Sequence, residues 1–288
     1  MSALDYVKLA RPKDWAKNAF VLMPIPFALA AGGTLDLRSF ALGVVGFSLV
    51  TSAVYATNDA LDAERDRAHE KKRHRPVASG RISPSAALAF GLALLLLGVL
   101  CAALSGVTGT LLVIAAYVAK ELGYQLGLKH VPLVDVFLLS SGFVLRVVLG
   151  ALLVGAEPSS WLLLCSSTLA LFISLAKRRG ELARGMDAAH RPALAGYSLP
   201  YLDLAMAVSA GMTLMGYALY CMDAQVLLPG REFASLPFVV FGVLEYLRLS
   251  QVRGEGGSPV DLLLRSPALV LCGVGWTLAS LWSVGLPI

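Results

Sequence analysis

The stretch from Ala56 to Asp66 carries the side chains whose types and spacing best suit chemistry. Asn58, Asp62 and Asp66 recur every four residues, so a helix would place them on one face, and Asp59 lies three residues before Asp62. Carboxylates that share a face repel one another, and a shared cation removes that cost. Mg²⁺ prefers oxygen ligands and is usually held by one or two carboxylates together with substrate phosphates. The spacing therefore predicts a Mg²⁺ site for a diphosphate, with a solvated acidic helix end as the alternative.

Basic residues follow this acidic stretch directly. Arg73 and Arg75 precede a turn at residues 76–80, Pro-Val-Ala-Ser-Gly, which would direct them back towards the acids. Metal on some oxygens and arginine forks on others is a combination that suits a diphosphate or triphosphate ester. Membrane topology alone explains the neighbouring Lys71 and Lys72, but explains the two arginines less well.

Two further charged groups lie near or inside apolar stretches. Arg146 falls near the middle of an expected membrane span, where a buried arginine is costly unless it is paired or faces a polar cavity. Two explanations of this arginine are equally good: it lines such a cavity, or it pairs with Asp135, about three helical turns away. Lys129 is interpreted as a phosphate contact at the mouth of the site. At the end of another span, Lys177 shares a helix face with Glu181.

Long apolar stretches must position these residues. Of 288 residues, 57% are hydrophobic and 15% are charged, with a mean hydropathy of +0.72. About 20 apolar residues cross a bilayer as a helix, and inside lipid each backbone amide must be bonded within its segment. The sequence lacks the alternation of membrane strands. We therefore expect an all-α, polytopic membrane bundle in one domain, residues 1–288. Its nine helices should lie near 18–35, 39–57, 84–104, 107–125, 132–154, 158–176, 199–221, 232–250 and 267–286.

Lys and Arg residues gather in alternate loops of this arrangement. Only Arg38 and Arg231 fall on the other side. By the positive-inside rule, the N-terminus and the charged loops should be cytoplasmic in an inner (plasma) membrane protein, with the C-terminus outside. The same residues account for a pI near 9.1 without a nucleic-acid partner. Met1–Lys17 is polar and charged, so no signal peptide is expected.

Nine spans and the pattern Asn-Asp-x-x-Asp-x-x-x-Asp after the second resemble the UbiA superfamily of membrane prenyltransferases. The resemblance implies a helical bundle with a central, cytoplasm-facing cavity, in which two aspartate-rich motifs hold Mg²⁺ and a prenyl diphosphate. The first motif matches as Asn58, Asp59, Asp62 and Asp66. Where the second is expected, this chain has residues 177–181, Lys-Arg-Arg-Gly-Glu.

That departure is similar to one branch of the superfamily, the decaprenyl-phosphate phosphoribosyltransferases. The matching positions run from residue 11 to about residue 182 and form four groups: Arg11, Pro12, Trp15, Lys17 and Asn18; Lys72, Arg73, Arg75 and Pro76; Tyr124, Lys129, His130, Asp135 and Arg146; Lys177, Arg178, Glu181 and Leu182. The branch implies Mg²⁺-dependent transfer of 5-phosphoribose from phosphoribosyl diphosphate to a polyprenyl (decaprenyl) phosphate, with release of diphosphate.

The resemblance also implies roles for individual residues. Metal ligands are expected at Asn58, Asp59, Asp62 and Asp66, and catalytic carboxylates among Asp59, Asp62 and Glu181. The expected substrate-binding residues are Lys17, Asn18, Arg73, Arg75, Tyr124, Lys129, Arg146, Lys177 and Arg178. Two alternatives stay open, a prenyltransferase acting on an aromatic or other acceptor and a transporter or structural membrane protein. A homo-oligomer, dimeric or trimeric, is also possible.

Overall fold

The computed structural model describes residues 2–68, 72–186, 192–253, 262 and 265–286, and every regular element in these ranges is helical. In chain order they are α1 (Ala3–Ala10), the 3₁₀ helix η1 (Pro12–Leu22), α2 (Ile25–Ala30), α3 (Leu37–Leu61), α4 (Ala63–Arg67), η2 (Lys72–His74), α5 (Pro84–Leu104), α6 (Thr108–Gln125), η3 (Leu128–His130), α7 (Val134–Leu153), α8 (Ser160–Ala183), η4 (Pro192–Gly196), α9 (Leu199–Asp223), α10 (Leu236–Val252) and α12 (Pro267–Ser283). The expected all-α class is confirmed.

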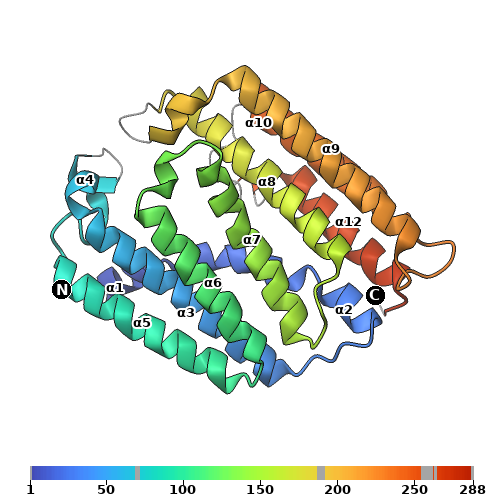
Figure 1. Cartoon of the computed structure of the whole chain (residues 1–288), viewed down its shortest axis with the longest axis horizontal. Coiled ribbons are helices and arrows are strands. Elements are labelled where there is room, and N and C mark those ends of the chain that lie inside the picture. Colours follow the sequence, from blue (N-terminus) through green and yellow to red (C-terminus); the bar gives the residue numbers. More distant parts are fainter. Residues whose placement is uncertain (1, 69–71, 187–191, 254–261, 263–264, 287–288) are drawn as a thin grey trace.

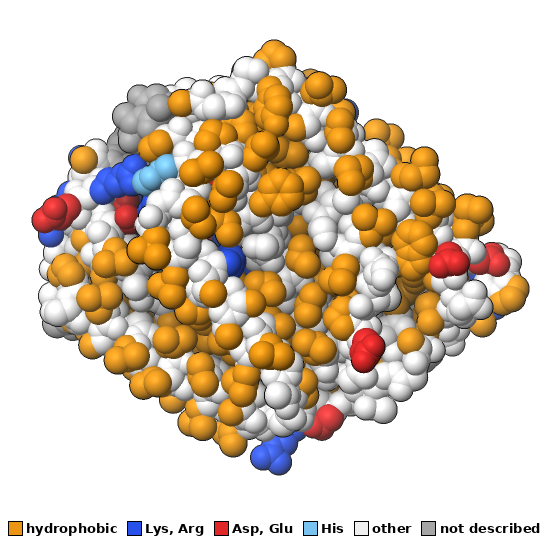
Figure 2. Space-filling model, viewed as in Figure 1, with side chains coloured by type: hydrophobic (Ala, Val, Ile, Leu, Met, Phe, Trp, Pro, Cys, Tyr) orange, Lys and Arg blue, Asp and Glu red, His pale blue; other side chains and the backbone are white. Residues whose placement is uncertain are grey.

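The apolar stretches of the sequence form the long helices. Within the described ranges, α3, α5, α7, α8 and α9 are long and apolar enough to cross a membrane, and α12 is a shorter apolar helix. The first expected span, residues 18–35, is not one continuous helix but comprises η1, a turn and α2. Pro24 and Pro26 explain the interruption, because proline lacks the amide hydrogen that a helix interior needs. Figure 2 shows hydrophobic side chains over most of the visible face, with charged ones mainly near its edges.

Local signals determine where several of these helices begin. Each has a short polar side chain at its N-cap that accepts a bond from a backbone N–H of the first turn, which that turn cannot satisfy itself. These residues are Asp36 for α3, Ser83 for α5, Ser159 for α8, Ser198 for α9 and Ser266 for α12. A proline in the first two positions of α5, α9 and α12 strengthens the same signal.

Small residues allow the closest helix contacts. A Cβ added to Gly98 on α5 would lie 2.7 Å from the Gly46 carbonyl oxygen on α3, and one added to Gly46 would lie 2.7 Å from the Gly98 oxygen. A Cβ on Gly150 of α7 would overlap the carbonyl of Val21 in η1. Small residues at helix contacts are typical of membrane bundles, where backbones must approach closely.

The helices form two groups that meet along α7 and α8 (Figure 1). One group, α3, α5, α6 and α7, encloses a core that includes Phe47, Val113 and Leu149. The other, α8, α9, α10 and α12, encloses a core that includes Leu202 and Tyr246. We call the end of the bundle formed by α4, η2, η3 and the C-terminal end of α8 the charged end, and the end at which α8 begins and α9 terminates the far end.

Candidate functional site

The aspartate stretch forms one wall of the charged end. Successive helical hydrogen bonds, from Asp62 N to Asn58 O and from Asp66 N to Asp62 O, span the junction of α3 and α4 and keep the expected spacing. Arg75 Nη1 donates to Asp59 Oδ1 at 3.1 Å and to Asp66 Oδ2 at 2.6 Å. The predicted return of Arg75 to the acids is therefore confirmed. Asp59 and Asp66 are only 2% and 3% exposed.

Other basic residues complete this first wall. Arg11 Nη2 donates to Asp59 Oδ1 at 2.6 Å, and Lys72 Nζ lies 3.8 Å from Asp66 Oδ1. Arg11 lies between α1 and η1 with φ of 51°, a left-handed conformation that directs the chain into η1. Arg73 is exposed on η2 and forms no ion pair with these acids among the described residues. Of the two arginines predicted to face the acids, the structure brings only Arg75 into the wall.

Asp62 is the most accessible of these acids. Its side chain is 31% exposed, and its Oδ1 lies 3.9 Å from Lys129 Nζ. Lys129 also donates to Gln125 Oε1 at 2.8 Å. Asn58 is half-buried one turn before Asp62. The structure thus places Lys129 beside the carboxylate wall.

Arginines already bond Asp59 and Asp66, so Asp62 is the acid of this wall most available to a divalent cation that a phosphate ligand completes. No three His, Cys, Asp or Glu side chains of the described ranges gather closely enough to form a metal site by themselves. The Arg75 guanidinium lies between Asp59 and Asp66, so the fold already holds a positive charge between two carboxylates. Mg²⁺ characteristically takes one or two carboxylates and fills its remaining positions with phosphate oxygens and water.

A second wall is built on α8. Arg178 is fully buried, and its Nη1 donates to Glu181 Oε2 at 2.7 Å while its Nε donates to Asp135 Oδ2 at 2.5 Å. Its Nη2 is buried without a hydrogen-bond partner among the described residues. The suggested pairing of Asp135 with Arg146 is wrong, because Asp135 on α7 faces α8 and pairs with Arg178.

Tyr197 supports this second wall from outside α8. Its hydroxyl donates to Asp135 Oδ1 at 2.7 Å and accepts from the backbone N–H of Leu133 at 2.6 Å. Leu133 has φ of 66°, an uncommon left-handed backbone for leucine at the start of α7. Burial and the adjacent Asp135 carboxylate raise the pKa of Tyr197, so the phenol stays protonated and donates.

The C-terminal end of α6 lies between the two walls. Tyr124 is close enough to Arg178 to interact with its charge, while the next residue, Gln125, bonds Lys129 of the first wall. Lys177 is half-buried on α8 beside Arg178. The structure therefore brings residues predicted from distant parts of the sequence to one end of the bundle.

A third polar group lies deeper, below the first wall. Arg146 Nε donates to Asn18 Oδ1 at 2.9 Å and Nη1 donates to the Gly142 carbonyl at 2.6 Å. Lys17, the residue before Asn18, donates to Asp14 and to the Tyr55 hydroxyl. Burial alone would lower the pKa of Lys17, but Tyr55 and Asp14 outweigh it and raise that pKa above its ordinary value. Lys17 therefore stays charged.

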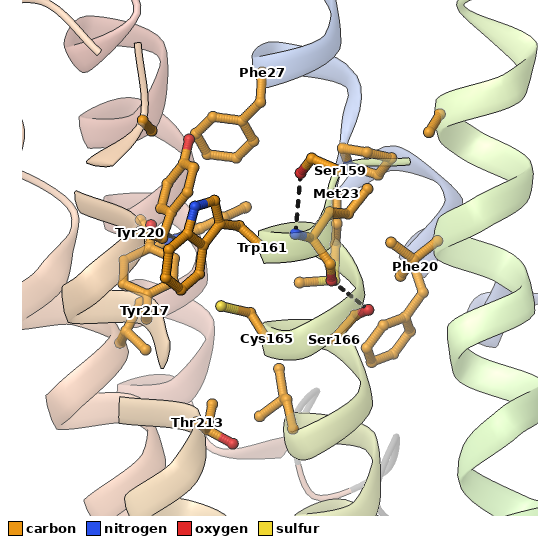
Figure 3. A pocket seen from close by; sticks show the side chains of 18 of the residues that line it. Phe20, Met23, Phe27, Ser159, Trp161, Cys165, Ser166, Thr213, Tyr217 and Tyr220 are labelled. Atoms are coloured by element: carbon orange, nitrogen blue, oxygen red, sulfur yellow. Dashed lines mark hydrogen bonds between the residues drawn. The ribbon is translucent and has the colours of Figure 1, made fainter. Parts of the chain in front are cut away.

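An apolar cavity of about 570 Å³ begins beside this third group. Its lining includes Phe20 and Phe172, and it extends to Trp161 and Asp223 at the far end. Figure 3 shows Tyr217, Tyr220 and Trp161 together on one side of the cavity and Phe20 and Met23 on the other. The lining is aromatic and aliphatic, as a hydrocarbon ligand requires. A cavity that faces the charged end remains a prediction.

Two charged or polar residues near these groups were not predicted from the sequence: Tyr197, which bonds Asp135, and Lys120 on α6. Tyr197 is preceded by a short 3₁₀ helix and has no sequence signal. Lys120, whose Nζ lies 4.7 Å from the centre of the Tyr117 ring, does have one. It forms a charged pair with Glu121 inside an otherwise apolar span, and such residues are functional candidates by default.

The fold and the site together define a class of protein: a multi-pass helical membrane protein whose charged end combines paired carboxylates with buried arginines. The chain belongs to the UbiA prenyltransferase family, which matches residues 19–249. The membership expected from the aspartate motif is thereby confirmed.

Relatives within the family are more specific. The chain is 34% identical to the decaprenyl-phosphate phosphoribosyltransferase of Corynebacterium glutamicum, over 96% of this chain and 86% of that protein. It is also 34% identical to the enzyme of the same name from Mycobacterium tuberculosis, over 94% of this chain and 91% of that protein. The fold is similar to that of a UbiA homolog from Archaeoglobus fulgidus bound to GPP and Mg²⁺, with a TM-score of 0.74 at 20% identity over 98% of this chain and 100% of that one.

Proposed function

We propose that this protein transfers 5-phosphoribose from phosphoribosyl diphosphate to a polyprenyl phosphate and releases diphosphate in a Mg²⁺-dependent reaction. The observation that carries the proposal is the buried ion-pair network of Arg178 with Asp135 and Glu181. The two carboxylates balance the charge of Arg178, but its Nη2 has no hydrogen-bond partner among the described residues and could donate to a phosphate oxygen beyond those of a diphosphate. Phosphoribosyl diphosphate carries a diphosphate and a separate 5-phosphate. The names of the relatives of this protein, decaprenyl-phosphate phosphoribosyltransferases, agree with this donor.

The first wall binds the diphosphate in this proposal. Asn58, Asp59, Asp62 and Asp66 would hold Mg²⁺, which neutralises charge on the leaving diphosphate when bound. Arg75 then shares its positive charge between the carboxylates and the phosphate oxygens. Asp62 is the carboxylate best placed to reach a ligand, because its side chain is 31% exposed.

The second wall and Lys129 stabilise the charge that develops on the diphosphate. The C1–O bond to diphosphate breaks while an oxygen of the acceptor phosphate bonds to ribose C1. The acceptor phosphate is already anionic, so the reaction needs no strong general base. Fixed donors and charges around the departing group, among them Lys129 and the Arg178 Nη2 that has no partner in the described ranges, then supply the main catalytic effect. Glu181 is engaged by Arg178, so it acts chiefly by holding that guanidinium in place.

The topology supports a cytoplasmic charged end. Phosphoribosyl diphosphate is a water-soluble metabolite, whereas the acceptor has an apolar tail that the cavity beside Phe20 and Phe172 would accommodate. Lysines and arginines concentrate on the loops of the charged end, as the positive-inside rule requires of cytoplasmic loops.

A transfer assay tests the proposal. Purified protein is incubated with Mg²⁺, polyprenyl phosphate and labelled phosphoribosyl diphosphate, and lipid-linked ribose phosphate is measured. A parallel reaction contains a prenyl diphosphate and an aromatic acceptor. Labelled lipid in the first reaction only is the expected result. Turnover in the second reaction only would overturn the proposal in favour of an aromatic prenyltransferase, and turnover in neither would favour a non-enzymatic membrane protein.

A further inference from the structure

Arg146 is a buried cation whose hydrogen-bond partners among the described residues are all neutral. It is 5% exposed, and its bonds go to the Asn18 side-chain amide and the Gly142 carbonyl. Its Cζ lies 5.2 Å from the centre of the Phe47 ring and 5.6 Å from that of Tyr117. Aromatic faces and amide oxygens attract a cation but do not cancel its charge. Within the described part of the chain, no carboxylate forms an ion pair with Arg146.

A second cation lies beside it. A Cβ added to Gly142 would be 3.0 Å from Lys120 Nζ and 3.4 Å from Arg146 Nη1, so both side chains meet over the bare backbone of Gly142. Lys120 also contacts the Tyr117 ring, as Arg146 does. Glu121 pairs with Lys120. Two cations and one carboxylate leave a net positive charge inside the bundle, and like charges this close repel unless an anion joins them.

The apolar cavity approaches this pair of cations, but neither Arg146 nor Lys120 belongs to its lining. Phe20 and Val147 line the cavity, and Val147 follows Arg146 on α7. The Phe20 ring lies 5.0 Å from the Phe143 ring, whose centre is 5.9 Å from Arg146 Cζ. The Phe20 and Phe143 rings therefore connect the lining of the cavity to Arg146, so a head group that displaced them would meet the two cations.

We infer that Arg146 and Lys120, with Asn18 orienting Arg146, form a binding subsite for a phosphate monoester, separate from the diphosphate wall at Asp59 and Arg75. This inference rests on the proposed function and specifies it further. Both proposed substrates carry this chemistry, because the lipid acceptor and the 5-position of the donor are each phosphate monoesters. The apolar cavity, which Phe20 and Val147 line close to Arg146, favours the lipid as the source.

Binding measured without Mg²⁺ tests the subsite independently of turnover. Thermal unfolding of the purified full-length protein is followed in the presence of polyprenyl phosphate, polyprenol of the same length, and ribose 5-phosphate. A ligand that binds only the folded state raises the unfolding temperature. We expect the wild type to gain more from polyprenyl phosphate than from polyprenol, and Arg146→Gln to lose that difference, with binding about tenfold weaker or more.

Two matched variants separate charge from folding. Arg146→Lys keeps the positive charge and should retain part of the phosphate-specific stabilisation. Arg231→Gln removes an arginine that lies over the Trp282 ring at the far end and should behave as the wild type. An effect of Arg146→Gln on ribose 5-phosphate instead of the lipid would place the donor's 5-phosphate in the subsite. Equal stabilisation of wild type and Arg146→Gln by both phosphates would overturn the inference.

The outcome is distinct from that of the transfer assay. Arg146-dependent phosphate binding in a protein that transfers no ribose phosphate would contradict the proposed function and leave the subsite in place. Transfer activity without any Arg146-dependent phosphate binding would support the proposed function and contradict the subsite.

Discussion

Arg178 Nε donates to Asp135 Oδ2 at 2.5 Å, and neither side chain is accessible to solvent. The pair joins α8 to α7 and supplies the only full charge partner of Arg178 besides Glu181 among the described residues. Burying such a pair costs desolvation energy, and removing one partner leaves an uncompensated charge. The geometry of Arg178 therefore depends on Asp135.

Asp135→Asn should destabilise the protein by about 3 kcal/mol or more and lower the transfer rate, because Arg178 loses a charge partner. Thermal unfolding and kcat measure the two effects. Adding Arg178→Gln to Asp135→Asn should restore part of the stability but no activity. Asp203→Asn is the control, since it removes the partner of Arg179 from a side chain that is 36% exposed. Equal effects of Asp135→Asn and Asp203→Asn would argue against a special role of the Asp135 pair.

Tyr197→Phe removes one hydroxyl that bonds both Asp135 and the Leu133 backbone. Leaving these buried partners unsatisfied should cost about 1–3 kcal/mol, measured by denaturant unfolding, and should raise the KM for phosphoribosyl diphosphate more than the KM for the lipid. Tyr201→Phe is the matched control, because Tyr201 stacks on Tyr197 but is 42% exposed. If both substitutions changed the two KM values alike, Tyr197 would have only a structural role.

Asp62→Asn should raise the Mg²⁺ concentration required for half-maximal activity by about tenfold, the equivalent of one charge-assisted contact of about 1.4 kcal/mol. Activity should also disappear on chelation and return when Mg²⁺ is added. Glu64→Gln, a change at an exposed acid of α4 two residues later, should leave the Mg²⁺ requirement unchanged. An unaltered Mg²⁺ titration of Asp62→Asn would exclude Asp62 from the metal site.

Gly98→Ala should lower the unfolding temperature, because its new methyl group would lie 2.7 Å from the Gly46 carbonyl and force α3 and α5 apart. Overpacking of this kind costs about 1–3 kcal/mol. Gly211→Ala on α9 meets nothing within 4 Å and should be neutral or slightly stabilising, since alanine favours helix more than glycine does. Thermal unfolding of both variants in one detergent makes the comparison, and equal unfolding temperatures would show that the helix contact is not tight.

Much of the fold follows from the sequence because its signals are local. Runs of apolar residues that follow an N-cap residue predict the long helices. Recognising such a helix requires only its own residues and not a distant partner. The exception is the first expected span. Its hydropathy predicts one continuous helix, whereas Pro24 and Pro26 interrupt it, and hydropathy does not register that effect.

The candidate site also combines features that are local in the sequence with features that depend on helix packing. The spacing of Asn58, Asp62 and Asp66 is a property of one helical stretch, so the sequence by itself determined the acidic face of the first wall. The partner of Asp135 depends on how α7 packs against α8. Only the tertiary structure shows that this partner is Arg178, 43 residues away, and not Arg146. Arg146 instead meets Asn18, 128 residues away. Contacts within a helix follow from its fixed pitch, whereas contacts between helices follow from which faces pack together.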